Sequence, residues 1–462
     1  MSCGAGSAYS RYSFWLETAG DDLTPRPALH GTVNADIAIL GAGFTGLWTA
    51  YYLQRLDPSL RIVVVEKEIA GFGASGRNGG WCSAGFALGP AVLRERVGTD
   101  AARAMFCALF ESVDEVGASL ERESIGADYT KGGSLRLALG THQAPALSDM
   151  LEGYRTLGLE DHYHHLDAAE VAARVRVEGA TGGVYSPHAA VLHPGKVVRG
   201  LARVVEAGGA TLYEQTEAVD FAPGRLSTRD GELRAQTVVL AGESYLSRFR
   251  RMHRQLVPVY SLIALSEPLT DAQWEEIGWE GRECVASCRL SVDYLQRTAD
   301  GRILFGGRGA PYRFGSRIRD EYDRHPRTHE LLRRLARQWF RPLADVQFTH
   351  AWGGPLGVTR DWMPAIGYDP GRGLAWSYGY AGQGVSTANL AGRTLADLLT
   401  STASARTELP IVGHLPPRWE PEPLRWFGIR WVQSGYQRLD DRSERTGSPP
   451  DGRTVAERLG RH

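Results

Sequence analysis

The sequence lacks the features of nucleic-acid-binding, exported or membrane-spanning proteins. Its 52 basic and 53 acidic side chains leave a formal net charge of −1, so no overall field attracts phosphate backbones or anionic lipid. Residues 1–15 lack the apolar run of a signal peptide, and no stretch reaches the roughly 18–20 apolar residues that span a bilayer. We therefore expect no nucleic-acid partner, no membrane partner and a cytoplasmic location.

Cysteine and lysine are also scarce. The five cysteines have no CxxC spacing, and a chain of 462 residues is large enough to fold without disulfides, which favours a reducing compartment. No metal site is predicted. The length indicates two or three domains, and 55 glycines indicate many tight backbone turns.

A strand, a helix and a second strand are predicted between residues 35 and 66. Residues 35–40 (ADIAIL) and 61–66 (RIVVVE) are short apolar runs, and residues 44–56 carry apolar side chains at helical spacing. Two such strands joined by a helix within about thirty residues predict a right-handed crossover in a parallel sheet.

A glycine-rich turn joins the first predicted strand to the helix, with the residues Gly41, Ala42, Gly43, Phe44, Thr45 and Gly46. Gly41 allows the tight turn, Gly43 lets a pyrophosphate approach the helix N-terminus, and Gly46 lets helix and strand pack closely. Glu66 stands twenty residues beyond Gly46, where a carboxylate can accept both ribose hydroxyls, and Lys67 beside it joins the predicted binding residues. The carboxylate disfavours NADP, whereas NAD and FAD both remain open.

A second glycine-rich segment favours FAD over NAD. Residues 71–80 read GFGASGRNGG, and so much backbone freedom predicts a loop that lies along a long ligand. A flexible loop without a ligand is the alternative interpretation.

With these segments the chain resembles the D-amino-acid oxidase-like superfamily of flavoproteins, and within it the γ-glutamylputrescine oxidase-like branch. The resemblance runs from about Asn34 to Leu399. It rests on GAGFTG with Glu66, GASGRNGG, HPGK, GRILFGGRGAPYRFGS, HAWGGPLGVTRDWMPAIG and GYAGQGV. It implies FAD as the cofactor. Noncovalent binding is expected because sarcosine oxidases attach flavin to a cysteine just before the segment matched by 358–367, and this chain has no cysteine after Cys288.

The resemblance also implies further cofactor-binding residues. The glycine-rich loop is expected to run along the flavin and to bring Trp81 towards the substrate. A late turn is expected at the flavin pyrimidine, where backbone N–H groups at a helix start would stabilise negative charge on the reduced ring. The residues assigned in this way are Gly73, Ala74, Ser75, Arg77, Asn78 and Gly79 in the loop, Ala241 and Gly242 after a buried strand, and Gly379, Gly382, Gly384 and Val385 in the late turn.

Five residues are candidates for the catalytic face: Trp81, Tyr294, Arg297, His350 and Trp352. Tyr294 and Arg297 precede a predicted turn at residues 300–301, and strands of this kind build the family's substrate pocket; a surface position is the alternative. His350 is either a site histidine or a core residue held by one hydrogen bond.

The predicted fold is α/β with an α+β substrate lobe. A Rossmann-type FAD-binding domain is expected to be interleaved with a smaller, sheet-containing substrate domain. The expected ranges are 34–100, 187–256 and 349–400 for the FAD-binding domain, 101–186 and 257–348 for the substrate domain, and 401–462 for a C-terminal arm. The sequence does not indicate the number of subunits.

The expected activity is oxidation of an amine. A hydride passes from the amine α-carbon to flavin N5, and the imine is hydrolysed to a carbonyl compound. O2 is the expected acceptor. Another acceptor remains open, because sarcosine oxidases use a lysine near the flavin and this sequence has none beyond Lys196.

The expected substrate has no α-carboxylate and is similar to γ-glutamylputrescine. Glycine oxidases hold that carboxylate with two arginines, and the matching positions here are Leu356 and Gly382. A desolvated carboxylate without a cation is costly. A distant acid group remains open, because Arg297 or the arginine at position 308 could hold it. Arg360, four residues beyond Leu356, could also swing into the pocket. The main alternative is an amino-acid oxidase or dehydrogenase of the glycine, sarcosine or D-amino-acid type. A pyridine-nucleotide dehydrogenase and a non-catalytic dinucleotide-binding module are more remote.

Overall fold

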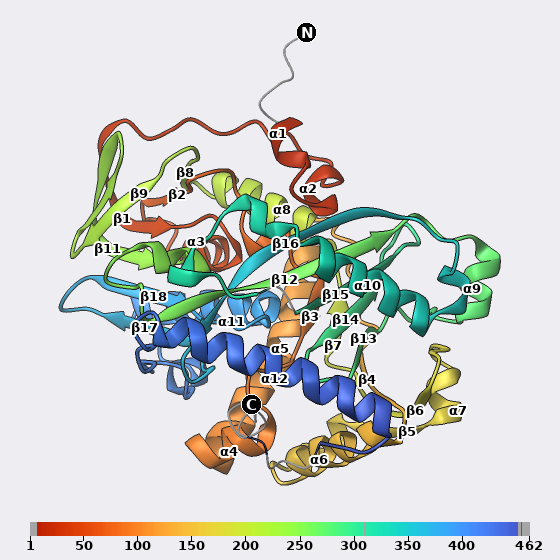
Figure 1. The fold of residues 1–462 in the computed structure, drawn as a ribbon. Coiled ribbons are helices and arrows are strands. Elements are labelled where there is room, and N and C mark those ends of the chain that lie inside the picture. The colour runs from red at the N-terminus through yellow and green to blue at the C-terminus, as the bar shows by residue number, and fades with distance from the viewer. Residues whose placement is uncertain (1–6, 309–310, 451–453, 455–462) are drawn as a thin grey trace.

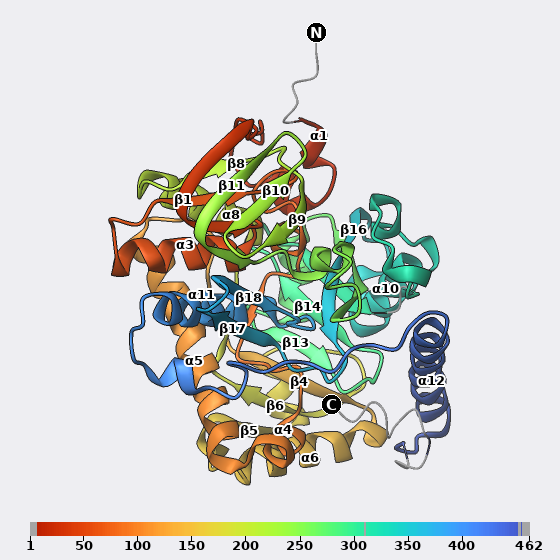
Figure 2. The same ribbon diagram turned by 90° about the vertical axis from the view of Figure 1, so that its left-hand side faces the viewer.

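Two sheets occupy the two halves of the molecule, as Figure 1 shows and as Figure 2 shows after a quarter turn. The structure is a computed structural model that describes residues 7–308, 311–450 and 454. The end of the predicted C-terminal arm, at 451–453 and 455–462, and residues 309–310 of the matched segment 301–316 lie outside the described residues.

The first sheet contains the predicted strand-helix-strand unit. Its strands are β1 (Gly31–Leu40), β2 (Ile62–Val65), β8 (Thr211–Tyr213), β9 (Ala218–Ala222), β10 (Arg225–Thr228), β11 (Gly231–Leu240), β17 (Ala365–Asp369) and β18 (Leu374–Tyr378). The order is β17-β18-β11-β1-β2-β8, and the hairpin β9-β10 extends from β11. β1 is parallel to β2 and β11, and β11 is parallel to β18. The predicted α/β fold with a Rossmann-type domain is confirmed.

The second sheet has the strand order β16-β12-β15-β14-β13-β4-β6-β5. In chain order these strands are β4 (Ser134–Leu139), β5 (His164–Asp167), β6 (Ala180–Ser186), β12 (Leu256–Ser266), β13 (Cys284–Ser287), β14 (Asp293–Arg297), β15 (Ile303–Arg308) and β16 (Phe348–Thr359). A short pair, β3 (Trp81–Ser83) with β7 (Ala189–Val191), forms a third sheet. Its register joins Trp81 to Val191 and so connects the glycine-rich loop to the strand before the HPGK segment.

Helices cover both sheets, and helical segments also lie near both ends of the described chain. They are α1 (Ser7–Ser10), α2 (Phe14–Glu17), α3 (Phe44–Leu56), α4 (Pro90–Val97), α5 (Thr99–Arg122), α6 (Ala144–Arg155), α7 (Ala168–Ala172), α8 (Pro194–Ala207), α9 (Asp271–Ile277), α10 (Pro326–Trp339), α11 (Gly384–Leu399) and α12 (Leu424–Thr446). The range 401–462, expected as a C-terminal arm, contains α12, which crosses one face of the molecule in Figure 1. Within the described residues, no helix combines the length and apolar character needed to cross a bilayer.

Strand β16 belongs to the second sheet. It pairs with β12 from Phe348 to Thr359, although residues 349–400 were expected in the FAD-binding domain. Helix α5, expected in the substrate domain, contributes Phe106, Leu109 and Val113 to the core around α3 and α11. The interleaved division into domains stays a proposal, and we propose to draw its last boundary after Thr359.

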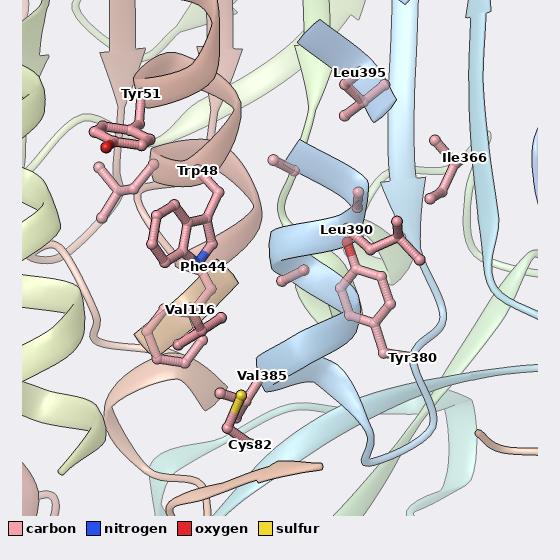
Figure 3. Close-up of a cluster of buried hydrophobic side chains, with 14 of the residues drawn as sticks. Phe44, Trp48, Tyr51, Cys82, Val116, Ile366, Tyr380, Val385, Leu390 and Leu395 are labelled. Atoms are coloured by element: carbon pink, nitrogen blue, oxygen red, sulfur yellow. The ribbon is translucent and has the colours of Figure 1, made fainter. Parts of the chain in front are cut away.

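Helices α3 and α11 pack against each other in the hydrophobic core that covers one face of the first sheet. Figure 3 shows Trp48 of α3 on one side of α11, and Leu390 pointing towards Tyr380 and Ile366 on the other. Contact is closest at Gly392, where an added Cβ would lie 2.6 Å from the Cβ of Trp48 and 2.8 Å from the Trp48 backbone. Because both helices begin at predicted cofactor-binding turns, this contact sets the spacing of those turns.

Replacing Gly392 by alanine should lower the free energy of unfolding by about 1–3 kcal/mol, because the helices must move apart to admit the methyl group. The matched control is Gly428→Ala in α12, where an added Cβ meets no atom within 4 Å. That alanine should be neutral or raise stability by up to about 1 kcal/mol, since it favours a helix more than glycine does. Urea unfolding measures both changes. Equal stability of the Gly392 variant and the wild type would contradict the packing argument.

Candidate active site

A cavity of about 580 Å³ lies at the carboxyl ends of the parallel strands of the first sheet. Its walls include the turns that follow β1, β2 and β11, and residues of the second sheet close its far end. The carboxyl edge of a parallel sheet is where α/β folds bind dinucleotides. We refer to this space as the first cavity.

Most of the predicted cofactor-binding residues line the first cavity. They are Gly41, Gly43, Phe44, Thr45, Glu66, Lys67, Gly73, Ala74, Ser75, Arg77, Asn78, Gly79, Ala241, Gly242, Gly382, Gly384 and Val385. Ala42, Gly46 and Gly379 are not among the lining residues. An added Cβ on Gly46 would lie 2.0 Å from the Gly41 carbonyl oxygen, so this glycine serves close packing of helix and strand. The contacts of each residue with a cofactor stay a prediction.

Glu66 lies at one end of the first cavity, just after β2. Its carboxylate accepts hydrogen bonds from the backbone N–H groups of Ala42, at 3.0 Å, and Glu68, at 3.2 Å. Burial raises the pKa of Glu66 to about 7, even though these two donors favour the charged form. The two hydroxyls of a ribose would supply the further donors that a buried carboxylate needs, so this residue fits FAD. Lys67 beside it pairs with Glu217 at 3.3 Å.

The start of α3 fits a pyrophosphate. Gly43 precedes this 13-residue helix and offers no side chain to cap it. Instead, the backbone N–H of Phe44 donates to Ser75 Oγ at 2.8 Å, and an added Cβ on Gly43 would lie 3.0 Å from that oxygen. The open N-terminus of the helix, its dipole and the absence of a side chain together suit an anionic group.

The glycine-rich loop is anchored through Arg77, whose side chain is buried. The guanidinium pairs with Asp323, and its Nε donates to the carbonyl oxygen of Phe72 at 2.7 Å. Burial raises the pKa of Asp323 to about 7, whereas the Arg77 charge opposes that rise. Arg77 was predicted to bind the cofactor. Its charge is paired with Asp323, and this ion pair holds the loop in place. Asp323 was not predicted, because it lies 246 residues away with no local motif around it.

Helix α2 and Trp352 hold the same loop by its carbonyl groups. The Nε1 of Trp15 donates to the Asn78 oxygen at 2.7 Å, and the Nε1 of Trp352 donates to the Arg77 oxygen at 2.9 Å. Ser13 Oγ donates to the Gly76 oxygen at 2.7 Å. Neither α2 nor this use of tryptophan was predicted from the sequence.

An acid that the sequence did not single out, Glu243, follows β11 and contacts the late turn. The carboxylate of Glu243 accepts from the backbone N–H groups of Gly357, at 2.6 Å, Gly379, at 3.0 Å, and Tyr380, at 3.2 Å. Burial raises the pKa of Glu243 despite these donors. The N–H of Gly379 therefore donates to Glu243, and the role of the N–H groups at the helix start stays a prediction. The N-terminus of α11 at Gly384 and Val385 still lines the first cavity.

Two of the five catalytic candidates line the first cavity. The centres of the Trp81 and Tyr294 rings are 5.8 Å apart, and both residues line the end of the first cavity that the second sheet closes. Trp81 Nε1 donates to the Leu295 oxygen at 2.9 Å, and the hydroxyl groups of Tyr294 and Ser261 are 2.9 Å apart. Both rings are therefore held in place by hydrogen bonds before any ligand binds.

Among the described residues that line the first cavity, Arg297, His350 and Trp352 are not found, so the structure does not bring these three candidates to the predicted catalytic face. Arg297 is three residues from Tyr294 on β14 and so faces the opposite side of the sheet, with its guanidinium 4.0 Å above the Trp274 ring. His350 Nε2 lies 3.2 Å from the Glu17 carboxylate of α2. Trp352 is buried against the glycine-rich loop.

A second cavity, of about 410 Å³, adjoins the first. Four residues line both: Trp81, Arg136, Ala286 and Gln383. We call these four residues the neck. The second cavity continues to the stacked rings of Tyr154 and Tyr163, centred 3.4 Å apart. No motif marked this chamber, since its walls come from β4, β6, α6 and residues 83–92, which are far apart in sequence.

Comparisons with known proteins agree with this arrangement. A family model described as FAD dependent oxidoreductase (DAO) matches residues 36–398. Gamma-glutamylputrescine oxidoreductase of Escherichia coli (strain K12) is 27% identical over 409 residues, which cover 87% of this chain and 92% of that protein. A probable oxidoreductase OrdL of Rhizobium meliloti (strain 1021) is 29% identical over 87% of this chain and 90% of its own. The crystal structure of glycine oxidase from Geobacillus kaustophilus has a TM-score of 0.66 at 22% identity, over 84% of this chain and 100% of that chain.

Replacing Glu66 by alanine should weaken the retention of FAD, because it removes charge-assisted hydrogen bonds of about 1.5–3 kcal/mol to the adenosine ribose. The matched control is Asp36→Ala on β1, whose carboxylate pairs with Arg61 at 2.8 Å and does not line the cavity. Dialysis followed by the ratio of flavin to protein absorbance measures retention. Full occupancy of the Glu66 variant would show that this strand end does not hold the ribose.

Proposed function

Because the chain belongs to the DAO family of FAD-dependent oxidoreductases, we propose that it oxidises an amine with no carboxylate on the reacting carbon. Leu356 and Gly382, the two positions matched to carboxylate-binding arginines of glycine oxidases, both line the first cavity. An apolar side chain and a glycine offer no cation there. This observation carries the proposal, and the gamma-glutamylputrescine oxidoreductase at 27% identity supports it.

Bound FAD supplies the two-electron acceptor that takes a hydride from the carbon next to the amine nitrogen. The chain orients the amine and keeps water away during that step. Trp81, Tyr294 and Leu356 form the walls at this end of the first cavity. Water then hydrolyses the imine product to a carbonyl compound and ammonia or a smaller amine.

We propose O2 as the terminal acceptor. Among the described residues that line the first cavity, lysine is represented by Lys67, which lies next to Glu66 and pairs with Glu217. No ammonium group therefore stands beside Trp81 and Tyr294. Groups other than a lysine would therefore have to promote the reduction of O2 in this cavity. The identity of the acceptor is tested by measuring peroxide release and reoxidation by quinones.

Acid precipitation should release all of the FAD into the supernatant. The described cysteines are Cys82, Cys107, Cys284 and Cys288, and none of them lines the first cavity, so no thiol is positioned to bond the flavin ring. The absorbance of the supernatant and of the redissolved pellet measures the two fractions. Yellow colour that stays with the denatured protein would contradict noncovalent binding.

Aliphatic amines and acylated diamines should reduce the bound flavin faster than glycine, sarcosine or D-amino acids do. The reason is the desolvation cost of an α-carboxylate beside Leu356 and Gly382. Anaerobic bleaching of flavin absorbance ranks the compounds, and peroxide release in aerated samples tests O2 as acceptor. Faster bleaching by the amino acids would assign the enzyme to the amino-acid oxidases, and reoxidation by quinones alone would make it a dehydrogenase.

A further inference from the structure

We propose that Arg136 binds an anionic group at the far end of the substrate, so that the enzyme selects elongated amines with a distal carboxylate or phosphonate. The inference rests on the proposed function, because it assumes that the amine is oxidised beside Trp81 and Tyr294. It assigns a use to the second cavity and names the residue that determines specificity there.

Arg136 is placed where the two cavities meet. It lies on β4 and is one of the four neck residues, with Trp81, Ala286 and Gln383. A substrate whose amine lies beside Trp81 in the first cavity can therefore extend past Arg136 into the second. The volume of the second cavity, about 410 Å³, is within the usual size of a small-molecule site.

Among the described residues, Arg136 forms no ion pair. Its Nη1 donates to the carbonyl oxygen of Ser287 at 2.8 Å, which is its one side-chain hydrogen bond within the described residues. Across the same residues, no carboxylate oxygen lies within 4.0 Å of its guanidinium nitrogens. A half-buried guanidinium has five N–H donors in a planar fork, and those left over here suit a bidentate anion.

The other basic residues of the first cavity are already engaged. Arg77 pairs with Asp323, and Lys67 and Arg229 both pair with Glu217. The guanidinium of Arg248 lies over the Tyr245 ring at 5.2 Å.

Two of the arginines that the sequence offered lie away from the neck. Arg297 faces the opposite side of β14, and Arg360 pairs with Glu420 at 3.0 Å. The side chain of residue 308 lies outside the described part of the structure.

Three further titratable groups lie near the neck or line the second cavity. The buried carboxylate of Asp293 accepts from the backbone N–H and the hydroxyl of Ser287, at 2.8 and 2.7 Å. Burial raises its pKa, and the nearby charges of Arg289 and Arg136 oppose that rise. Burial lowers the pKa of His188 to about 4, so this lining residue is neutral near pH 7. Asp149 is exposed on α6 at the rim of the second cavity, where water screens its charge.

The hydroxyl-bearing residues Ser83, Ser134 and Ser186 also line the second cavity, and the stacked Tyr154 and Tyr163 supply an aromatic wall. This combination suits a chain with an amide or methylene body and a charged end.

The test compares two matched substrates, 1,4-diaminobutane acylated on one nitrogen with glutaric acid or with pentanoic acid. They differ only by a terminal carboxylate in place of a methyl group. The wild type should prefer the glutaryl compound by about 10–100-fold in kcat/KM, the range expected for hydrogen bonds to a charged group. In Arg136→Gln this ratio should fall to near one, and Arg136→Lys should restore part of it because the charge returns.

Arg297→Gln is the matched control, since it removes a guanidinium from the same sheet on its other face and should keep the wild-type ratio. Each variant is first checked for wild-type FAD occupancy. A wild-type ratio near one, or an unchanged ratio in Arg136→Gln, would overturn this inference while leaving amine oxidation intact. If neither compound nor any simple amine reduces the flavin of the wild type, the proposed function itself fails, and the inference falls with it.

Discussion

The glycine-rich loop at residues 71–80 depends on one buried ion pair, between Arg77 and Asp323. Two charges taken out of water are costly, and removing one partner leaves the other uncompensated. The pair is also where the halves of the molecule meet, because Arg77 follows the first sheet and Asp323 precedes α10 on the second. Ser13, Trp15 and Trp352 bind carbonyl groups of the same loop, so several distant segments hold this wall of the first cavity.

Features encoded by short spacing were predictable from the sequence. The helix at residues 44–56 has the expected bounds, and Glu66 follows β2 at the edge of the first cavity, because periodicity and turn chemistry act within a few residues. Features formed by residues that are far apart in the sequence could not be predicted in this way. No local sequence pattern indicates that the Glu243 carboxylate accepts hydrogen bonds from three backbone N–H groups. Likewise, no local pattern indicates that Arg136 lies where the two cavities meet.

Two groupings made from the sequence differ from the structure for a common physical reason. Arg297 and Tyr294 were grouped because they are close in sequence, but three residues along a strand place side chains on opposite faces. Likewise β16 was grouped with the flavin-binding segments that follow it, although it pairs with β12 of the second sheet along its length from Phe348 to Thr359. Residues that are close in sequence on a β-strand can contact different parts of the molecule. Residues that are close in sequence around a glycine-rich turn line the same cavity here.

The contacts of the glycine-rich loop also bear on biosynthesis. Asp323 and Trp352 follow Arg77 by 246 and 275 residues, so a ribosome must translate most of the chain before the loop acquires its anchors. The first strand-helix-strand unit can form much earlier, since its contacts are local. A nascent chain can therefore present the nucleotide half of the site long before the flavin-facing half is rigid. The second sheet needs β16 and the first sheet needs β17 and β18, so the two sheets are not both complete until residue 378 has been translated.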